Sequence, residues 1–179
     1  MSDEKLYFAY GSNINLNQMA FRCPNATPVC PVTLDNYELT FSGGGVATIV
    51  PAEGKQVPGL LWELTPECER ALDHYEGFPS YYDKQEIVVK AADNTGYRVM
   101  AYVMTPQFSR DAVVPSEFYY NGIRDGYIQN GMDTTPLEKA LQKTKKEAER
   151  FQGDFFPWYN EKPAANKAKK PKKSGRHER

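Results

Sequence analysis

Histidine and cysteine are scarce in this chain of 179 residues, which contains two histidines and three cysteines. The histidines are His74 and His177, and the cysteines are Cys23, Cys30 and Cys68, at irregular intervals. A structural zinc site needs about four such ligands at regular spacing, so the sequence contains no zinc pattern. Because the number of cysteines is odd, reduced thiols in a cytoplasmic protein are the simplest interpretation.

Long apolar runs are also missing. No stretch approaches the roughly 20 residues of a membrane-spanning helix, and residues 1–5 lack the apolar core of a signal peptide. We therefore expect no membrane association. The sequence has no internal repeat, and its length predicts one domain with a sizeable core. Apolar residues make up 40% and aromatic residues 13%, which is typical of a globular fold whose aromatic side chains can line a pocket.

Positive charge is concentrated at the C-terminus. Residues 161–179 contain eight Lys or Arg and two Glu, a balance of +6, which leaves −7 on the rest of a chain whose net charge is −1. This segment has no large apolar side chain, so we expect residues 1–160 to form the domain and residues 161–179 to be a disordered basic tail. A solvated tail is the simpler interpretation, and nucleic-acid contact is the less favoured one.

The N-terminal segment predicts a strand, a tight polar turn and a helix. Residues 6–10 are apolar and aromatic, as in a buried strand. The run ends at Gly11-Ser12-Asn13, where glycine lets a ligand approach the backbone closely. A helix start follows, because Asn15 and Gln18 have the spacing of a capping box. Backbone N–H groups in such a turn can hold a carboxylate or phosphate, although an ordinary strand-to-helix connection has the same pattern.

A second helix, with a carboxylate at its end, is predicted from Thr65 to Glu76. Thr65-Pro66-Glu67 combines an N-cap, a proline at the first position and an acid in the first turn. Gly77 ends the helix, and its apolar stripe consists of Cys68, Ala71, Leu72 and Tyr75. At the negative end of the helix dipole, Glu76 should have a raised pKa, and partial burial would raise it further. Such a carboxylate suits general acid–base chemistry near neutral pH, although an isolated Glu is more often simply solvated.

The remaining pattern predicts strands early in the chain and helices later. A proline-rich extended connection spans residues 24–31, and the glycines at 43–45 fit a flexible turn or, less commonly, the wall of a tight site. Helices are expected after Ser116 and after Thr135. Strands are expected at residues 37–41, 46–50, 57–64, 86–90 and 98–104. This order favours an α+β fold over a regular doubly wound sheet.

Several separate segments resemble the γ-glutamylcyclotransferase family. In chain order they are Phe8–Asn13, Gly44–Ile49, Gly59–Trp62, Leu72–Gly77, Tyr102–Thr105 and Pro115–Tyr119. The resemblance implies a small mixed β-barrel with helices packed outside. It also implies release of 5-oxoproline from a small-molecule γ-glutamyl amide, with no metal and no other cofactor.

The resemblance also assigns roles to residues of the site. It implies that Glu76 is the catalytic acid and base, since the substrate's α-amine must lose protons before it attacks its own γ-carbonyl. The backbone N–H groups of Gly11, Ser12 and Asn13 would hold the α-carboxylate of the substrate. The hydroxyls of Tyr10, Tyr82 and Tyr119 would position Glu76 or the substrate, and Tyr81 competes with Tyr82 for this role.

Other interpretations stay open at this level. An enzyme of the same family can act on γ-glutamyl amines such as the ε-amine of lysine, and a binding protein can keep the pocket without turnover. A homodimer is a further open option. Nucleophilic catalysis is disfavoured, because Ser12 has no partner histidine at a credible position, with His177 in the tail and His74 on the predicted helix.

Overall fold

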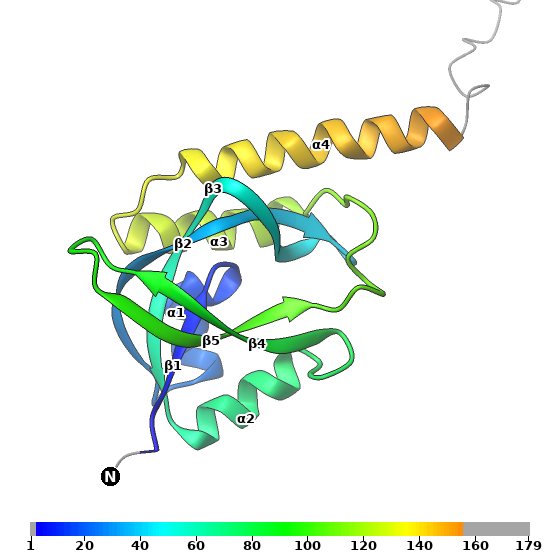
Figure 1. The fold of residues 1–179 in the computed structure, drawn as a ribbon. Helices are drawn as coiled ribbons and strands as arrows, with labels where there is room; N and C mark the ends of the chain where they lie inside the picture. The colour runs from blue at the N-terminus through cyan, green and yellow to red at the C-terminus, as the bar shows by residue number, and fades with distance from the viewer. Residues whose placement is uncertain (1–2, 156–179) are drawn as a thin grey trace, which may run out of the picture.

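The computed structural model describes residues 3–155, and the predicted basic tail at 161–179 lies outside them. Its centre is a closed barrel of five strands in the order β1-β3-β2-β4-β5. The barrel closes where β1 (Lys5–Ala9) pairs in parallel with β5 (Gly96–Met104), at Tyr7 and Met100. The other neighbouring strands are antiparallel (Figure 1). The α+β class and the mixed barrel are therefore confirmed.

The longest strands form a hairpin in which sequence reasoning divided one strand into two. Strand β2 (Thr27–Ser42) turns at the glycines 43–45 into β3 (Val46–Leu64). Residues 46–50 and 57–64 are thus in strand structure as predicted, but they are parts of one strand, so their separation into two is wrong. Residues 51–56 of β3 are mostly polar and mostly exposed. The pairing register between β2 and β3 shifts next to Asn36, opposite these residues. Gly54 has φ of 77° and donates its N–H to the Asn36 side chain (3.0 Å).

The prolines early in the chain also belong to a strand. The extended connection predicted for residues 24–31 ends at Thr27, where β2 begins, so Pro28 and Pro31 pair with Trp62 and Leu60 of β3. A register shift between Pro28 and Cys30 accompanies them. Proline has no N–H to donate to a ladder and is tolerated at such irregular positions near a strand end.

The second hairpin joins β4 (Tyr82–Lys90) to β5 and confirms the strands predicted at 86–90 and 98–104, each of which is longer than expected. The inward side chains of both hairpins and of β1 form the core. Close packing there requires Gly59, because a Cβ at this position would lie 2.2 Å from the Phe8 ring and 2.4 Å from the Ala9 carbonyl oxygen. The largest fully buried core residues of the strands are Phe8, Phe41, Ile49, Leu60, Leu61 and Leu64.

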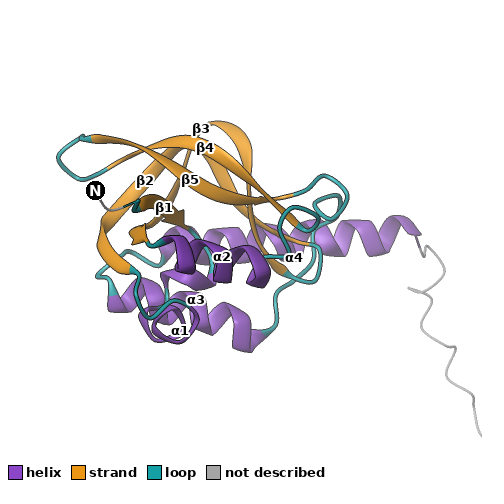
Figure 2. Ribbon diagram, turned by 90° about the horizontal axis from the view of Figure 1, so that it is seen from below, coloured by secondary structure: helices purple, strands orange, loops and turns teal. Residues whose placement is uncertain are grey.

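In the described part of the chain, four α-helices cover the barrel, and Figure 2 shows α1, α2 and α3 gathered on one side of the strands. Their bounds are Leu16–Arg22 for α1, Pro66–Tyr75 for α2, Glu117–Gln129 for α3 and Thr135–Phe155 for α4. The predicted N-caps Asn15, Thr65 and Ser116 are confirmed by side-chain hydrogen bonds to the backbone N–H three residues on. Helix α3 packs against the start of α1, where Asn15 and Asn130 exchange hydrogen bonds with the opposing backbone.

Candidate active site

One cavity of about 290 Å³ brings together every residue that the sequence assigned to a site. Its wall is formed by β1 and the turn after it, the start of β3, the end of α2, the start of β4, the later part of β5 and the first turn of α3. The predicted residues in this wall are Tyr10, Gly11, Ser12, Asn13, Glu76, Tyr82 and Tyr119. Residues that sequence reasoning did not assign to a role also line it, namely Tyr7, Val46, Ala47, Tyr75 and Tyr102.

The turn after β1 is a short 3-10 helix, η1 (Ser12–Ile14), and its side chains are buried. Its first internal hydrogen bond runs from Ile14 N to Gly11 O (3.1 Å), so the turn itself does not use the N–H groups of Ser12 and Asn13. The carbonyl of Asn13 accepts a bond from Trp62 Nε1 (3.1 Å), which fastens the turn to β3. At Gly11 a Cβ would come within 3.2 Å of the Ala47 Cβ, so glycine allows the turn to lie close to β3.

Glu76 is the C-cap of α2 and its side chain points at this turn. Its N–H bonds to Leu72 O (2.8 Å), and its Oε1 accepts a hydrogen bond from Asn13 Nδ2 (3.1 Å). Burial raises the pKa of Glu76 to about 7, while Arg22 and the Asn13 hydrogen bond act in the opposite direction. A carboxylate that titrates near neutral pH can take up and return a proton.

Two tyrosine hydroxyls bond the backbone of the same residue of β3, Ala47, on either side of its Cα. Tyr82 donates to Ala47 O (2.6 Å), and Tyr119 accepts from Ala47 N (3.0 Å). Tyr10, which follows β1, donates to the carbonyl of Tyr102 on the neighbouring strand β5. Burial raises the pKa of all three predicted tyrosines, so their hydroxyls stay neutral at physiological pH.

Both members of the pair Tyr81 and Tyr82 line the cavity, but they make different contacts. Tyr82 is buried and its hydroxyl bonds Ala47. Tyr81 is only partly buried, and its hydroxyl accepts a hydrogen bond from Gly44 N (2.9 Å). The glycine turn at 43–45 therefore adjoins the site through Tyr81. This contact ties the β2–β3 hairpin to the segment that follows α2.

The apolar stripe predicted on α2 is only half correct. Cys68 and Leu72 are buried, but Ala71 is exposed and Tyr75 is 48% exposed. Tyr75 lies at the cavity instead of the core, because its ring stacks against the guanidinium of Arg22, whose Cζ is 4.0 Å from the ring centroid.

Arg22, which contacts the turn without lining the cavity, is a further residue that sequence reasoning missed. It lies in the last turn of α1, where a cation is usual for its interaction with the helix dipole, so the pattern gave no reason to single it out. In the structure its guanidinium turns back to the N-terminal turn and contacts Ser12, Asn13 and Gln18. The spacing of Gln18 and Arg22, one helical turn apart, is the only signal that could have paired them.

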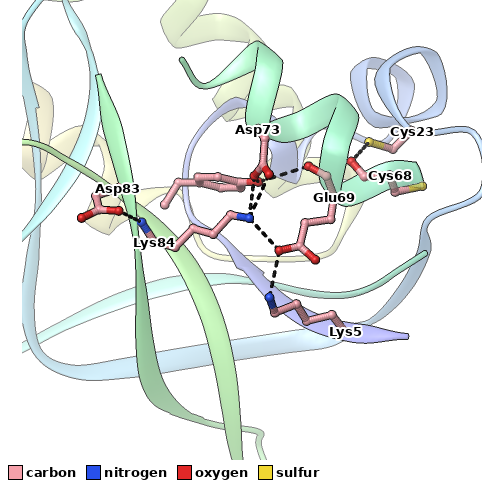
Figure 3. Close-up of polar contacts among 8 residues, drawn as sticks. Lys5, Cys23, Cys68, Glu69, Asp73, Asp83 and Lys84 are labelled. Atoms are coloured by element: carbon pink, nitrogen blue, oxygen red, sulfur yellow. Dashed lines mark hydrogen bonds and ion pairs between the residues drawn. The ribbon is translucent and has the colours of Figure 1, made fainter. Parts of the chain in front are cut away.

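A second polar network fastens α2 to the barrel (Figure 3). Lys84 of β4 contacts Glu69 (2.7 Å) and Asp73 (2.8 Å), and Lys5 also reaches Glu69 (2.8 Å). The hydroxyl of Tyr102, a residue of the cavity wall, donates to Asp73. This network fixes the helix whose end presents Glu76.

The cysteines are free thiols, and Cys23 Sγ donates to the carbonyl of Cys68 (3.6 Å; Figure 3). In the described part of the chain, no group of three His, Cys, Asp or Glu side chains is arranged to hold a metal ion. Within residues 3–155, no helix is both long enough and apolar enough to cross a membrane.

Comparison with known proteins shows to which family this closed barrel and its half-buried carboxylate belong. The model of the family described as "Gamma-glutamyl cyclotransferase, AIG2-like" matches residues 7–121. This chain belongs to that family, which confirms the resemblance seen in the sequence. Its named relatives are enzymes.

The relatives span most of the chain. A gamma-glutamylcyclotransferase of Mus musculus is 31% identical over 145 residues, which cover 75% of this chain and 76% of the relative. Its Homo sapiens counterpart is 31% identical over 144 residues, 74% and 73% of the two chains. A solved structure titled "Gamma-glutamyl cyclotransferase" superposes with a TM-score of 0.71 at 29% identity and covers 77% of this chain and 86% of its own.

Proposed function

We propose that this protein is a γ-glutamylcyclotransferase that releases 5-oxoproline from γ-glutamyl amino acids or peptides. The α-amine of the substrate attacks its own γ-carbonyl carbon, a new C–N bond closes the five-membered ring, and the amide C–N bond breaks. The leaving amine receives a proton, so atoms balance without water or any other reactant. The nucleophile is part of the substrate, and the protein mainly supplies geometry and proton transfer.

The single observation that carries this proposal is the position of Glu76. Its carboxylate lines the cavity in direct hydrogen-bond contact with Asn13 of η1, and its pKa of about 7 lets it exist in both protonation states near neutral pH. As the base it takes a proton from the α-ammonium, and as the acid it returns a proton to the leaving amine. A glutamate with the unperturbed pKa of about 4.3 is almost fully ionised at neutral pH and would be a poorer proton donor.

The turn supplies the complementary half of the site. The N–H groups of Gly11, Ser12 and Asn13 would bind the α-carboxylate of the substrate, which sets its α-amine beside Glu76. Tyr82 and Tyr119 hold the carbonyl and the N–H of Ala47, which fixes the start of β3 close to the turn. Tyr10 also lines the cavity and is held by its bond to the Tyr102 carbonyl. The three tyrosines thus shape the cavity through the backbone.

The test measures 5-oxoproline released from γ-glutamyl-alanine, glutathione and γ-glutamyl-ε-lysine by the purified protein. The proposal expects product from one of the first two. Product from γ-glutamyl-ε-lysine alone would instead assign the protein to γ-glutamyl amines. Binding of 5-oxoproline or a γ-glutamyl ligand in calorimetry, without product from any substrate, would identify a binding protein and overturn the proposal.

A further inference from the structure

Arg22 is held on three sides beside the proposed catalytic carboxylate. Its Nη1 donates to Asn13 Oδ1 (2.7 Å) and to Ser12 Oγ (3.1 Å), and its Nη2 donates to Gln18 Oε1 (2.8 Å). The Tyr75 ring stacks on its guanidinium. These contacts fix the side chain, half-buried, behind the turn that faces Glu76.

The chemistry of the guanidinium determines how the Asn13 amide is oriented. A guanidinium has only donors, so it must meet the oxygen of the Asn13 amide and not its nitrogen. The amide nitrogen is then directed the other way, where it donates to Glu76 Oε1 (3.1 Å) and to the Tyr7 hydroxyl (3.0 Å). A flipped amide would set donor against donor at Arg22 and oxygen against oxygen at Glu76.

We propose that Arg22 is a positioning residue, which acts through Asn13 to fix Oε1 of Glu76 and so leaves Oε2 for proton exchange with the substrate. This inference rests on the proposed function. Arg22 is not assigned a contact with substrate, since it is not among the residues that line the cavity and its donors already bond Asn13, Ser12 and Gln18.

Arg22 also sets the charge felt by Glu76. Four tyrosines interact electrostatically with Glu76. They are Tyr7 of β1, Tyr10 after β1, Tyr82 of β4 and Tyr119 of α3. All four are phenols with raised pKa values, and they are therefore uncharged near neutral pH. The guanidinium is the cation that favours the ionised carboxylate, so its loss should move the titration of Glu76 upward.

Two substitutions separate orientation from charge. Arg22→Met keeps an unbranched stem against Tyr75 but removes both the donors and the charge. Arg22→Lys keeps the charge but replaces the rigid fork by a point donor. Arg70→Met is the matched control, because Arg70 contacts only the exposed Glu67 side chain on the outer face of α2.

The expected results differ for the three variants. Arg22→Met should lower kcat roughly 10- to 100-fold with little change in KM, since misplacement of a reacting group has effects of this size. The acid limb of its pH–rate profile, which reports the titration of Glu76, should move to higher pH. Arg22→Lys should lower kcat while its acid limb stays near that of the native enzyme, and Arg70→Met should match the native enzyme in both.

Infrared difference titration of the Glu76 carboxyl, with Glu76→Gln as the reference, supplies a readout that needs no turnover. A higher midpoint in Arg22→Met, but not in Arg22→Lys, supports the inference even if the substrates prove to be different. An unchanged midpoint in folded Arg22→Met would overturn it. A rise in KM at constant kcat would also overturn it, because Arg22 would then bind substrate directly. If Arg22→Met does not fold, the kcat and midpoint of Arg22→Lys decide.

Discussion

The side-chain amide of Asn13 donates a 3.1 Å hydrogen bond to Glu76, although 63 residues separate the two along the chain. One residue follows the first strand of the barrel and the other caps the helix after the third. Their contact is the point where the turn and the carboxylate become one site.

Glu76 should make the fold less stable as pH rises. Its folded pKa of about 7 lies above the value for an unfolded Glu, so between about pH 4.5 and 7 the folded state binds more protons. Stability therefore falls across this window. Glu76→Gln cannot titrate, so relative to the native protein it should gain up to about 3 kcal/mol between pH 4.5 and pH 8.

Urea unfolding of both proteins at pH 4.5 and pH 8 measures this difference. Glu67→Gln is the control, because Glu67 lies exposed in the first turn of the same helix. Equal pH dependence in the native protein and in Glu76→Gln would mean that Glu76 is solvated and titrates like an ordinary carboxylate.

The Tyr82 hydroxyl should matter for stability as well as for the site. Tyr82→Phe leaves the Ala47 carbonyl without its 2.6 Å donor inside the barrel. An unsatisfied buried acceptor costs about 1–3 kcal/mol. Urea unfolding measures this loss, and Tyr97→Phe, at the partly buried far end of the second hairpin, is the comparison. Equal stability of the two variants would show that the Ala47 carbonyl accepts a hydrogen bond from another donor.

Lys84 should contribute more to stability than an ordinary surface lysine. It is 21% exposed and bridges Glu69 and Asp73, so Lys84→Met leaves two carboxylates of α2 close together without their shared cation. We expect a loss of about 1–2 kcal/mol that shrinks in high salt, since screening weakens such pairs.

The control for Lys84 is Arg98→Met, which breaks the exposed pair between Arg98 and Glu86 and should cost at most about 0.5 kcal/mol. If Lys84→Met lowers the free energy of unfolding no more than this control, the network around Lys84 does not fix α2 to the barrel.

Much of the fold could be predicted from the sequence because local signals were strong. The caps Asn15, Thr65 and Ser116 satisfy backbone donors within their own helix turns, so their pattern alone located three helices. The division of β3 failed because a bulge at Gly54 interrupts the apolar pattern while the strand continues. Alternation along one strand cannot reveal a partner strand that absorbs the irregularity.

The site was predicted only as far as the family's motifs reached. Gly11 to Asn13 and Glu76 stand in such motifs, and the fold brings them into one cavity. Arg22 was missed because its role depends on the direction in which its side chain leaves α1, which spacing does not encode. The contacts of Tyr82 and Tyr119 with Ala47 could not be predicted either, because they join residues that are far apart in the chain.

The most direct test of the account measures 5-oxoproline release and ligand binding by native protein and by Glu76→Gln. Gln keeps the size and a hydrogen-bonding group but cannot accept the proton of the amine, so kcat should fall by roughly 10²–10⁴-fold. Binding of a γ-glutamyl ligand in calorimetry should persist, because the account assigns its α-carboxylate to backbone N–H groups. Near-native turnover in Glu76→Gln would contradict the central claim that Glu76 carries the proton in this reaction.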